Sequence, residues 1–276
     1  MHSNLTHIMH RIYTLLLVII IVSFSSCTVK ESIVFNEDGS GNFLVNYDMA
    51  SVMSQMKDAF SEGDDSTSTN EKKPSKVVDT LMVFSEIMET YKDSISALPE
   101  EKRLALEVVK DMYMKMKMDE ANNVFDFGVG LNFNAIEDLK DIQKRIEKAK
   151  TLNSQNSQVD AMKEGSPLGK FMVNGENDVD YNFTENGFSR VTTVSEVKTA
   201  KAFKLDENSE EDKQFLDYFK NSFYIVEYTF SKKIKSTSIE NAQLSTDKKT
   251  VTYKYSWIDF LSNPKLLDIN IEFENE

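Results

Sequence analysis

Residues 112–133 have the sequence MYMKMKMDEANNVFDFGVGLNF, and this stretch carries the strongest evidence on the fold. Its first half has methionine at every second position: Met112, Met114, Met116 and Met118. Its second half has an apolar residue at every second position: Phe125, Phe127, Val129, Leu131 and Phe133. Successive side chains of a strand point to opposite faces, so this alternation predicts two strands, each with one buried face. A turn at Glu120–Asn123 joins them into a hairpin.

The row of methionines has a second interpretation, because thioether sulfurs are soft ligands that suit Cu(I). Burial of one strand face explains the row without a metal, since methionine fills irregular space in a core. All three histidines, His2, His7 and His10, lie in the first ten residues, and the single cysteine is Cys27. With no His or Cys to assist, we predict no metal site and no cofactor.

Two more hairpins are predicted on either side of this stretch. Turns at Asn36–Gly41 and at Glu185–Gly187 separate alternating apolar segments, and their glycines supply the positive φ of a tight turn. The paired segments are 32–35 with 42–47, and 179–183 with 188–194. The C-terminal part has further β-rich segments at 223–230, 233–236, 250–255 and 267–273.

Apolar residues at helical spacing follow Pro74. Spacings of four and three residues predict one buried helix face after this proline. Its members are Val77, Leu81, Phe84, Met88 and Tyr91.

Three other helices are predicted from their first residues. One opens at Pro99 and turns Leu104, Val108 and Val109 inward. Another opens with Asn134 and Glu137 as a capping-box-like pair. Its inward residues are Ile136, Leu139, Ile142 and Ile146. A third is capped by Ser209 with Asp212.

These elements together predict an α+β protein with an antiparallel sheet built from hairpins and helices packed on one side. Similar segments at Val45–Asp48 and Leu131–Asn134 each end a strand, which suggests two ββα-like units before a β-rich C-terminal part. Residues 27–149 form the first part, in which the wholly polar segment 61–74 is interpreted as a flexible loop. Residues 150–276 form the β-rich part, in the same domain or a second one.

Residues 1–26 are typical of an export signal. Arg11 is the one charged residue, and the apolar run Leu15–Val22 is followed by a short serine-rich stretch. The run is shorter than the roughly 20 residues that a membrane-spanning helix needs, and it fits the core of about 7–15 residues of a signal peptide. Without this segment, 31 basic and 45 acidic residues leave a formal charge of −14. Such a chain repels phosphate backbones, so we predict no nucleic-acid partner.

The stretch Phe24-Ser25-Ser26-Cys27 resembles the lipobox of bacterial lipoproteins, although Phe24 stands where Leu is usual. In that class the signal is removed before the cysteine, which then carries lipid. Together with the hairpin at Phe35–Gly41 and the segments Tyr228–Phe230 and Asn263–Lys265, it is similar to uncharacterised Bacteroidota lipoproteins. The resemblance implies lipidation at Cys27 and an envelope protein attached to the membrane through this lipid.

The resemblance also bears on location. Position 28 is Thr rather than the Asp that retains many lipoproteins in the inner membrane, which favours the outer membrane. Surface-exported members often have an acidic run after the cysteine, and here only Lys30-Glu31 is present. Periplasm-facing and surface locations therefore both stay open.

The mature chain after removal of the signal has no histidine and no free thiol, so catalysis of the Ser-His-Asp or Cys-His type is excluded. We therefore predict no catalytic residue. The leading hypothesis is a non-catalytic envelope lipoprotein that binds or scaffolds a protein or glycan partner. A glycan hydrolase needs only two carboxylates, so it stays an alternative. A carrier of a small ligand or lipid, which needs an enclosed cavity, is a third hypothesis. The aromatic group around Trp257 could form a platform for a ligand. The simpler interpretation is that its side chains alternate between core and surface at the end of a strand.

Overall fold

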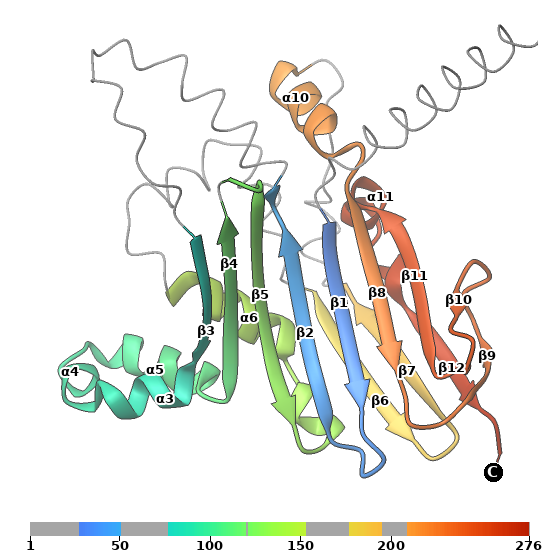
Figure 1. Ribbon diagram of the computed structural model, residues 1–276, viewed down its shortest axis with the longest axis horizontal. Coiled ribbons are helices and arrows are strands. Elements are labelled where there is room, and N and C mark those ends of the chain that lie inside the picture. Colours follow the sequence, from blue (N-terminus) through green and yellow to red (C-terminus); the bar gives the residue numbers. More distant parts are fainter. Residues whose placement is uncertain (1–27, 51–76, 120, 153–176, 195–208, 276) are drawn as a thin grey trace, which may run out of the picture.

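The computed structural model describes residues 28–50, 77–119, 121–152, 177–194 and 209–275. These residues form an α+β fold, the class that the sequence predicts, and their strands make two sheets (Figure 1). Sheet A has eight strands in the order β10-β11-β8-β1-β2-β5-β4-β3. Sheet B has four strands in the order β6-β7-β12-β9.

The strands of sheet A come from both halves of the chain. They are β1 (Thr28–Phe35), β2 (Gly41–Asp48), β3 (Val77–Val83), β4 (Met112–Asp119), β5 (Val124–Phe133), β8 (Phe223–Thr229), β10 (Gln243–Leu244) and β11 (Thr250–Ser256). Sheet B consists of β6 (Asp178–Thr184), β7 (Gly187–Thr193), β9 (Ile234–Thr237) and β12 (Ile269–Phe273).

The first strand joins the two halves of the chain. β1 pairs with β2 as an antiparallel hairpin and with β8 as a parallel neighbour, from Thr28 opposite Phe223 to Val34 opposite Thr229. All other strand pairs in the described sheets are antiparallel. The N-terminal hairpin and the C-terminal β-rich part therefore share one sheet.

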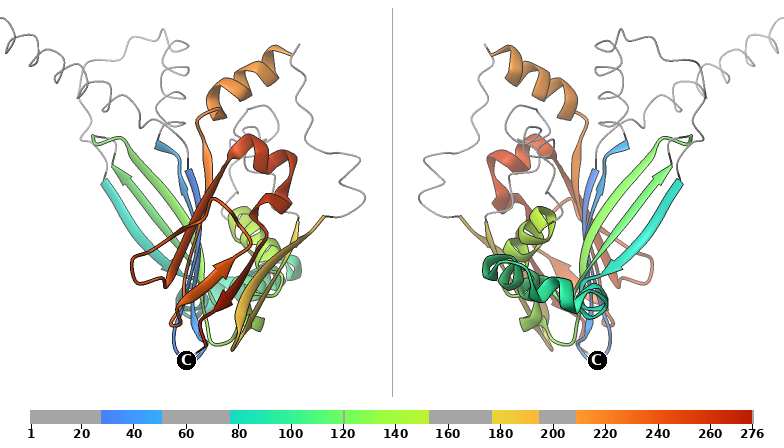
Figure 2. Two further views of the ribbon diagram at one scale, coloured as in Figure 1. Left: turned by 90° about the vertical axis from the view of Figure 1, so that its right-hand side faces the viewer. Right: turned by 90° about the vertical axis from the view of Figure 1, so that its left-hand side faces the viewer.

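The two sheets face each other across an aromatic cluster. Phe35 of β1 stacks on Phe183 of β6 with ring centroids 4.5 Å apart, and it also contacts Phe188 of β7 and Phe230. Figure 2 shows the sheets close together at the end of the β1–β2 turn and splayed apart toward the opposite end, with α6 and α11 in the space between them. Most buried apolar residues belong to one continuous core cluster.

The helices are short. They are α3 (Phe84–Thr90), α4 (Lys92–Ser96), α5 (Glu100–Val109), α6 (Ile142–Leu152), α10 (Glu210–Phe219) and α11 (Trp257–Ser262), with 3₁₀ turns η1 (Ile136–Leu139) and η2 (Pro264–Leu267). Ser209 Oγ accepts a hydrogen bond from the Asp212 backbone N–H, as predicted for the start of α10. The helix α11 was not predicted.

The central hairpin prediction is confirmed. Met112 of β4 lies opposite Leu131 of β5, and Met114 lies opposite Val129. Met112 and Met114 are 0% and 3% exposed, which makes them core residues. Packing of one strand face therefore accounts for this part of the methionine row.

The helix predicted after Pro74 is wrong over its first half. Val77–Val83 is the strand β3, which pairs antiparallel with β4, and Val77 and Leu81 are 66% and 60% exposed. A helix starts only at Phe84. The segment contains three β-branched valines, which favour a strand, and pairing with its neighbour β4 decided its structure.

Two further helix predictions need correction. In α5 the buried residues are Ala105 and Val109, whereas Leu104 and Val108, which were predicted to face inward, are 60% and 47% exposed. The helix predicted from Asn134 is divided into η1 and α6, because Asp141 between them has φ of 56°. Asp138, not Glu137, caps this start by accepting from the Asn134 and Ala135 backbone N–H groups.

Some predictions fall on residues outside the described ranges. They are the signal peptide with Cys27 and the loop 61–74.

Candidate functional site

A carboxylate lies on the buried face of β1. Alternation along the strand turns Val29, Glu31, Ile33 and Phe35 toward sheet B, and Glu31 is 0% exposed. Burying an ionised carboxylate in an apolar row is costly unless other groups compensate its charge.

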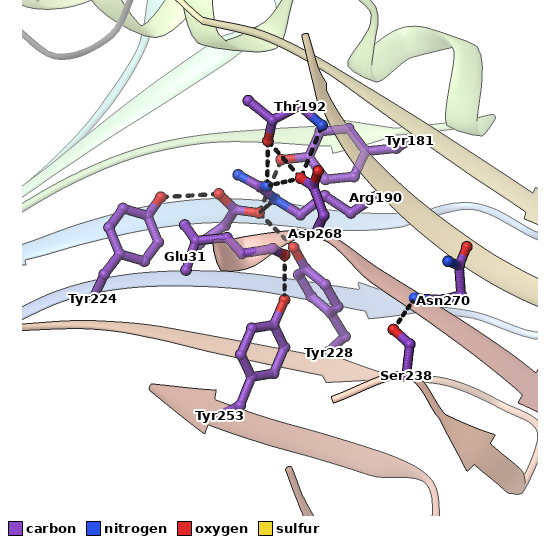
Figure 3. Close-up of polar contacts among 11 residues, drawn as sticks. Glu31, Tyr181, Arg190, Thr192, Tyr224, Tyr228, Ser238, Tyr253, Asp268 and Asn270 are labelled. Atoms are coloured by element: carbon purple, nitrogen blue, oxygen red, sulfur yellow. Dashed lines mark hydrogen bonds and ion pairs between the residues drawn. The ribbon is translucent and has the colours of Figure 1, made fainter. Parts of the chain in front are cut away.

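Glu31 receives four hydrogen bonds (Figure 3). Its Oε1 accepts from Tyr228 Oη at 2.5 Å, from Tyr181 Oη at 2.9 Å and from Arg190 Nε at 3.2 Å. Its Oε2 accepts from Tyr224 Oη at 2.9 Å. Such a set of donors suits an ionised carboxylate, which can accept about four hydrogen bonds.

Arg190 is in turn held by a second acid. Its Nη1 donates to Thr192 Oγ1 at 2.9 Å and lies 3.3 Å from Asp268 Oδ1. The same oxygen of Asp268 accepts from the Thr192 backbone N–H and hydroxyl, at 2.8 Å and 2.6 Å. The guanidinium therefore has a carboxylate on both sides, and it is 3% exposed.

We name Glu31, Tyr181, Arg190, Tyr224 and Tyr228 the Glu31 cluster. Glu31 of β1 and Tyr224 and Tyr228 of β8 belong to sheet A. Tyr181 of β6 and Arg190 of β7 belong to sheet B. The polar contacts thus cross from one sheet to the other inside the apolar core, as Figure 3 shows. Because its hydrogen bonds are directional and buried, such a network can fix how one sheet is positioned on the other.

The electrostatics of the cluster favour its charged form. Burial alone would raise the pKa of Glu31, but Arg190 and the three tyrosine hydroxyls outweigh it and hold the pKa below its ordinary value. Burial and the neighbouring Glu31 charge raise the pKa of Tyr224 and Tyr228 well above the ordinary value for tyrosine. Burial alone would lower the pKa of Arg190, but Glu31 together with the surrounding tyrosines outweighs it and raises this pKa.

These shifts determine what the cluster can do chemically. A general acid or base needs a pKa near the working pH. Glu31 and Arg190 stay charged and the tyrosines stay protonated at neutral pH, and both oxygens of Glu31 already accept hydrogen bonds. The cluster is therefore suited to holding the two sheets in register rather than to proton transfer.

A polar recess opens beside the cluster. Its outer part has a volume of about 260 Å³ and is lined by the η1–α6 connection and by β6. Lys144 Nζ bridges two carboxylates there, Asp141 at 3.0 Å and Asp178 at 2.7 Å. A narrower part of about 30 Å³ shares Gln143 with the outer part and reaches Arg190. Such a space has room for about two water molecules.

The aromatic group at the C-terminal end belongs to the core. Trp257 does not continue a strand but begins α11, where Ser256 Oγ accepts from the Asp259 backbone N–H. The Trp257 ring stacks on Tyr224 with centroids 5.7 Å apart, and Phe260 packs 4.6 Å from the same tyrosine. Trp257 is 3% exposed, so it forms no open platform for a ligand.

The site residues expected from the sequence and those found in the structure differ. Cys27, the predicted lipidation site, lies outside the described residues. The Glu31 cluster was missed, and Glu31 had been considered only as part of a weak acidic signal after the cysteine. The available signal was its spacing, because Glu31 stands between Val29 and Ile33 in an alternating row.

The described part of the chain contains neither a metal-site cluster nor a helix that could span a membrane. No three His, Cys, Asp or Glu side chains gather there as a metal site would need. No helix within the described ranges is long and apolar enough to cross a membrane.

Comparison with known proteins gives one neighbour. No protein-family model matches the chain, and no curated protein sequence is significantly similar to it. Among solved structures, the folded domain of the Mycobacterium tuberculosis protein LppM aligns with 90% of this chain and 87% of its own. The sequence identity is 6% and the TM-score 0.31, so no property of that domain is transferred here.

Proposed function

We propose that this protein is a non-catalytic envelope lipoprotein, anchored through lipid on Cys27, that binds or scaffolds a partner in the cell envelope. One observation carries the proposal. The first described strand, β1, begins at Thr28, the residue directly after the cysteine of the lipobox-like stretch. The first described strand thus begins one residue after the predicted start of the mature chain.

The absence of a catalytic role is supported by the state of the buried charged groups. Glu31 accepts four hydrogen bonds and Arg190 contacts two carboxylates, so both are committed to the fold. The favoured location is the outer membrane, on the strength of Thr28 after the cysteine.

Substitution of the cysteine tests the anchor. Cys27→Ala should lose metabolically incorporated palmitate and move from the membrane fraction to the soluble fraction of the producing bacterium. Ser32→Ala, a substitution within β1, should change neither. A Cys27→Ala protein that keeps its label and stays in the membrane fraction would contradict the proposal.

The glycan hydrolase alternative has one place in the described structure where it could reside. The polar recess contains several carboxylates, among them Asp141, Asp178 and Asp180. Two of them are already paired with Lys144, and aromatic side chains for sugar stacking are not among the residues that line the outer part. Hydrolysis of envelope glycan by the purified protein, lost in Asp180→Asn, would establish the alternative and overturn the non-catalytic role.

A further inference from the structure

We propose that the end of sheet A at which β1 begins faces the lipid bilayer and that the short anchor holds it there. This orientation rests on the proposed lipidation of Cys27. The orientation goes further than lipidation, because it names the part of the fold that contacts the membrane and identifies the lipid bilayer surface as its partner.

The lipid-bearing residue and the sheet are joined without a linker. Thr28 already pairs with Asp48 of β2 and with Phe223 of β8, so β1 has neighbours on both sides from its first residue. Consecutive Cα atoms lie about 3.8 Å apart, which puts Cys27 one residue's length from the sheet. A flexible linker of twelve Gly and Ser residues would instead span ~20 Å.

The anchor point is in the interior of the sheet. At this end β1 has β8 and β11 on one side and β2, β5, β4 and β3 on the other, because β10 pairs only with Val251 and Thr252, farther along β11. Neighbouring strands are about 4.8 Å apart, so strand ends extend roughly 10 Å to one side of the anchor and 19 Å to the other. If the sheet tilts to either side, these strand ends move into the bilayer, because the short anchor does not let the sheet move away from the membrane.

The surface at this end can be read from the strand register. Residues level with Thr28 in the neighbouring strands are Asp48, Asp126, Lys117, Phe223 and Ser256. The helix α10 lies beyond the same end, next to the start of β8 (Figure 1).

One side-chain pair near this end suits a bilayer interface. Lys254 Nζ lies 4.5 Å from the centroid of the Phe223 ring. This pair combines a positive charge with an apolar ring, and long charged side chains that combine the two are favoured at membrane interfaces. The carboxylates of Asp48 and Asp126 face each other at the same level and favour zwitterionic over anionic headgroups.

The orientation also determines which surfaces stay available to a partner. The β1–β2 turn lies at the other end of the strand, about 23 Å from Thr28 at ~3.3 Å per residue. This turn and the face of sheet A that carries Lys30 and Val34 point away from the bilayer or along it. A partner that the anchored protein binds would meet these surfaces first.

Fluorescent labels at two levels of the sheet test the orientation. Lys117→Cys and Lys220→Cys place a thiol near the anchored end on either side of β1, and Glu37→Cys places one at the β1–β2 turn. All three side chains are exposed. The lipidated full-length chain is labelled with a maleimide dye and reconstituted into vesicles of phosphatidylethanolamine and phosphatidylglycerol with a headgroup-attached nitroxide quencher.

The proposal expects quenching at positions 117 and 220 to be at least threefold stronger than at 37. Any other pattern overturns it. Insertion of twelve Gly and Ser residues between Cys27 and Thr28 serves as the matched control and should reduce the difference to less than 1.5-fold. A difference that survives the insertion would overturn the short anchor as its cause.

Flotation of the same vesicles separates the two proposals. A chain with Cys27 that fails to float with the vesicles contradicts lipid anchoring, and the orientation falls with it. A chain that floats but shows equal quenching at all three positions contradicts the orientation alone and leaves the anchor intact.

Discussion

Arg190 Nε lies 3.2 Å from Glu31 Oε1, although 159 positions of the sequence separate the two residues. Glu31 is 0% exposed and Arg190 3%. This ion pair joins β1, the strand that begins next to the proposed anchor, to β7 of the opposite sheet. Both side chains are buried, so we expect that removing either charge lowers the stability of the fold strongly.

Replacement of Glu31 by Gln should destabilise the fold strongly. The substitution keeps the size of the side chain but leaves Arg190 buried beside one carboxylate fewer, and breaking a buried pair costs about 3–5 kcal/mol. Urea unfolding followed by circular dichroism measures the change. Glu227→Gln is the matched control, because Glu227 pairs with Lys30 on the exposed face of the neighbouring strand, and a loss below ~1 kcal/mol is expected there. Equal losses in the two variants would contradict the special role of Glu31.

The stability should depend on pH in a way that this residue explains in part. The pKa of Glu31 is lowered in the folded state. Stability from this group is therefore fully present above the unfolded pKa of about 4.3 and is lost as the pH falls through the folded pKa. The gap in free energy of unfolding between wild type and Glu31→Gln should be constant near neutral pH and shrink as the pH falls below ~4. Urea titrations at several pH values give this gap, and a gap that widens on acidification would contradict the assignment.

Loss of one tyrosine hydroxyl should have a smaller effect. Tyr228→Phe removes the 2.5 Å hydrogen bond to Glu31 and nothing else from a side chain that is 0% exposed. Hydrogen bonds to charged groups contribute about 1.5–3 kcal/mol. Tyr91→Phe is the control, since that ring is 58% exposed, and surface changes stay within ~0.5 kcal/mol. Thermal unfolding of both variants checks the prediction, which a Tyr228→Phe protein as stable as wild type would refute.

The aromatic cluster between the sheets should depend on Phe35. Its ring contacts Phe133, Phe183, Phe188 and Phe230. Phe35→Ala leaves a cavity among these rings, and such changes cost about 3–5 kcal/mol. The neighbouring Val34 points the other way and is 45% exposed, so Val34→Ala should cost less than ~1 kcal/mol. Similar losses for both substitutions in chemical denaturation would show that the sheets do not depend on this cluster.

The helix predicted after Pro74 shows where local patterns are insufficient. Val77, Leu81 and Phe84 fit a helical stripe, yet Val77 and Leu81 belong to the strand β3. The apolar residues fit a helical spacing, but pairing with β4, whose partner residues lie 30 to 42 positions later, decided the outcome. The hairpins at 28–48 and 178–193 were predictable because their turns and alternation are contained in a short stretch.

The sequence by itself determined the α+β class, the hairpins, the strand with alternating methionines and the lipobox-like stretch that ends at Cys27. Each depends on side-chain period, turn residues or composition within a few neighbouring positions. Only the tertiary structure decided that β1 lies beside β8 and that Glu31 meets Arg190 and three tyrosines. These contacts join residues 150 or more positions apart. Their formation depends on how the two sheets pack together, which no local period of the sequence records.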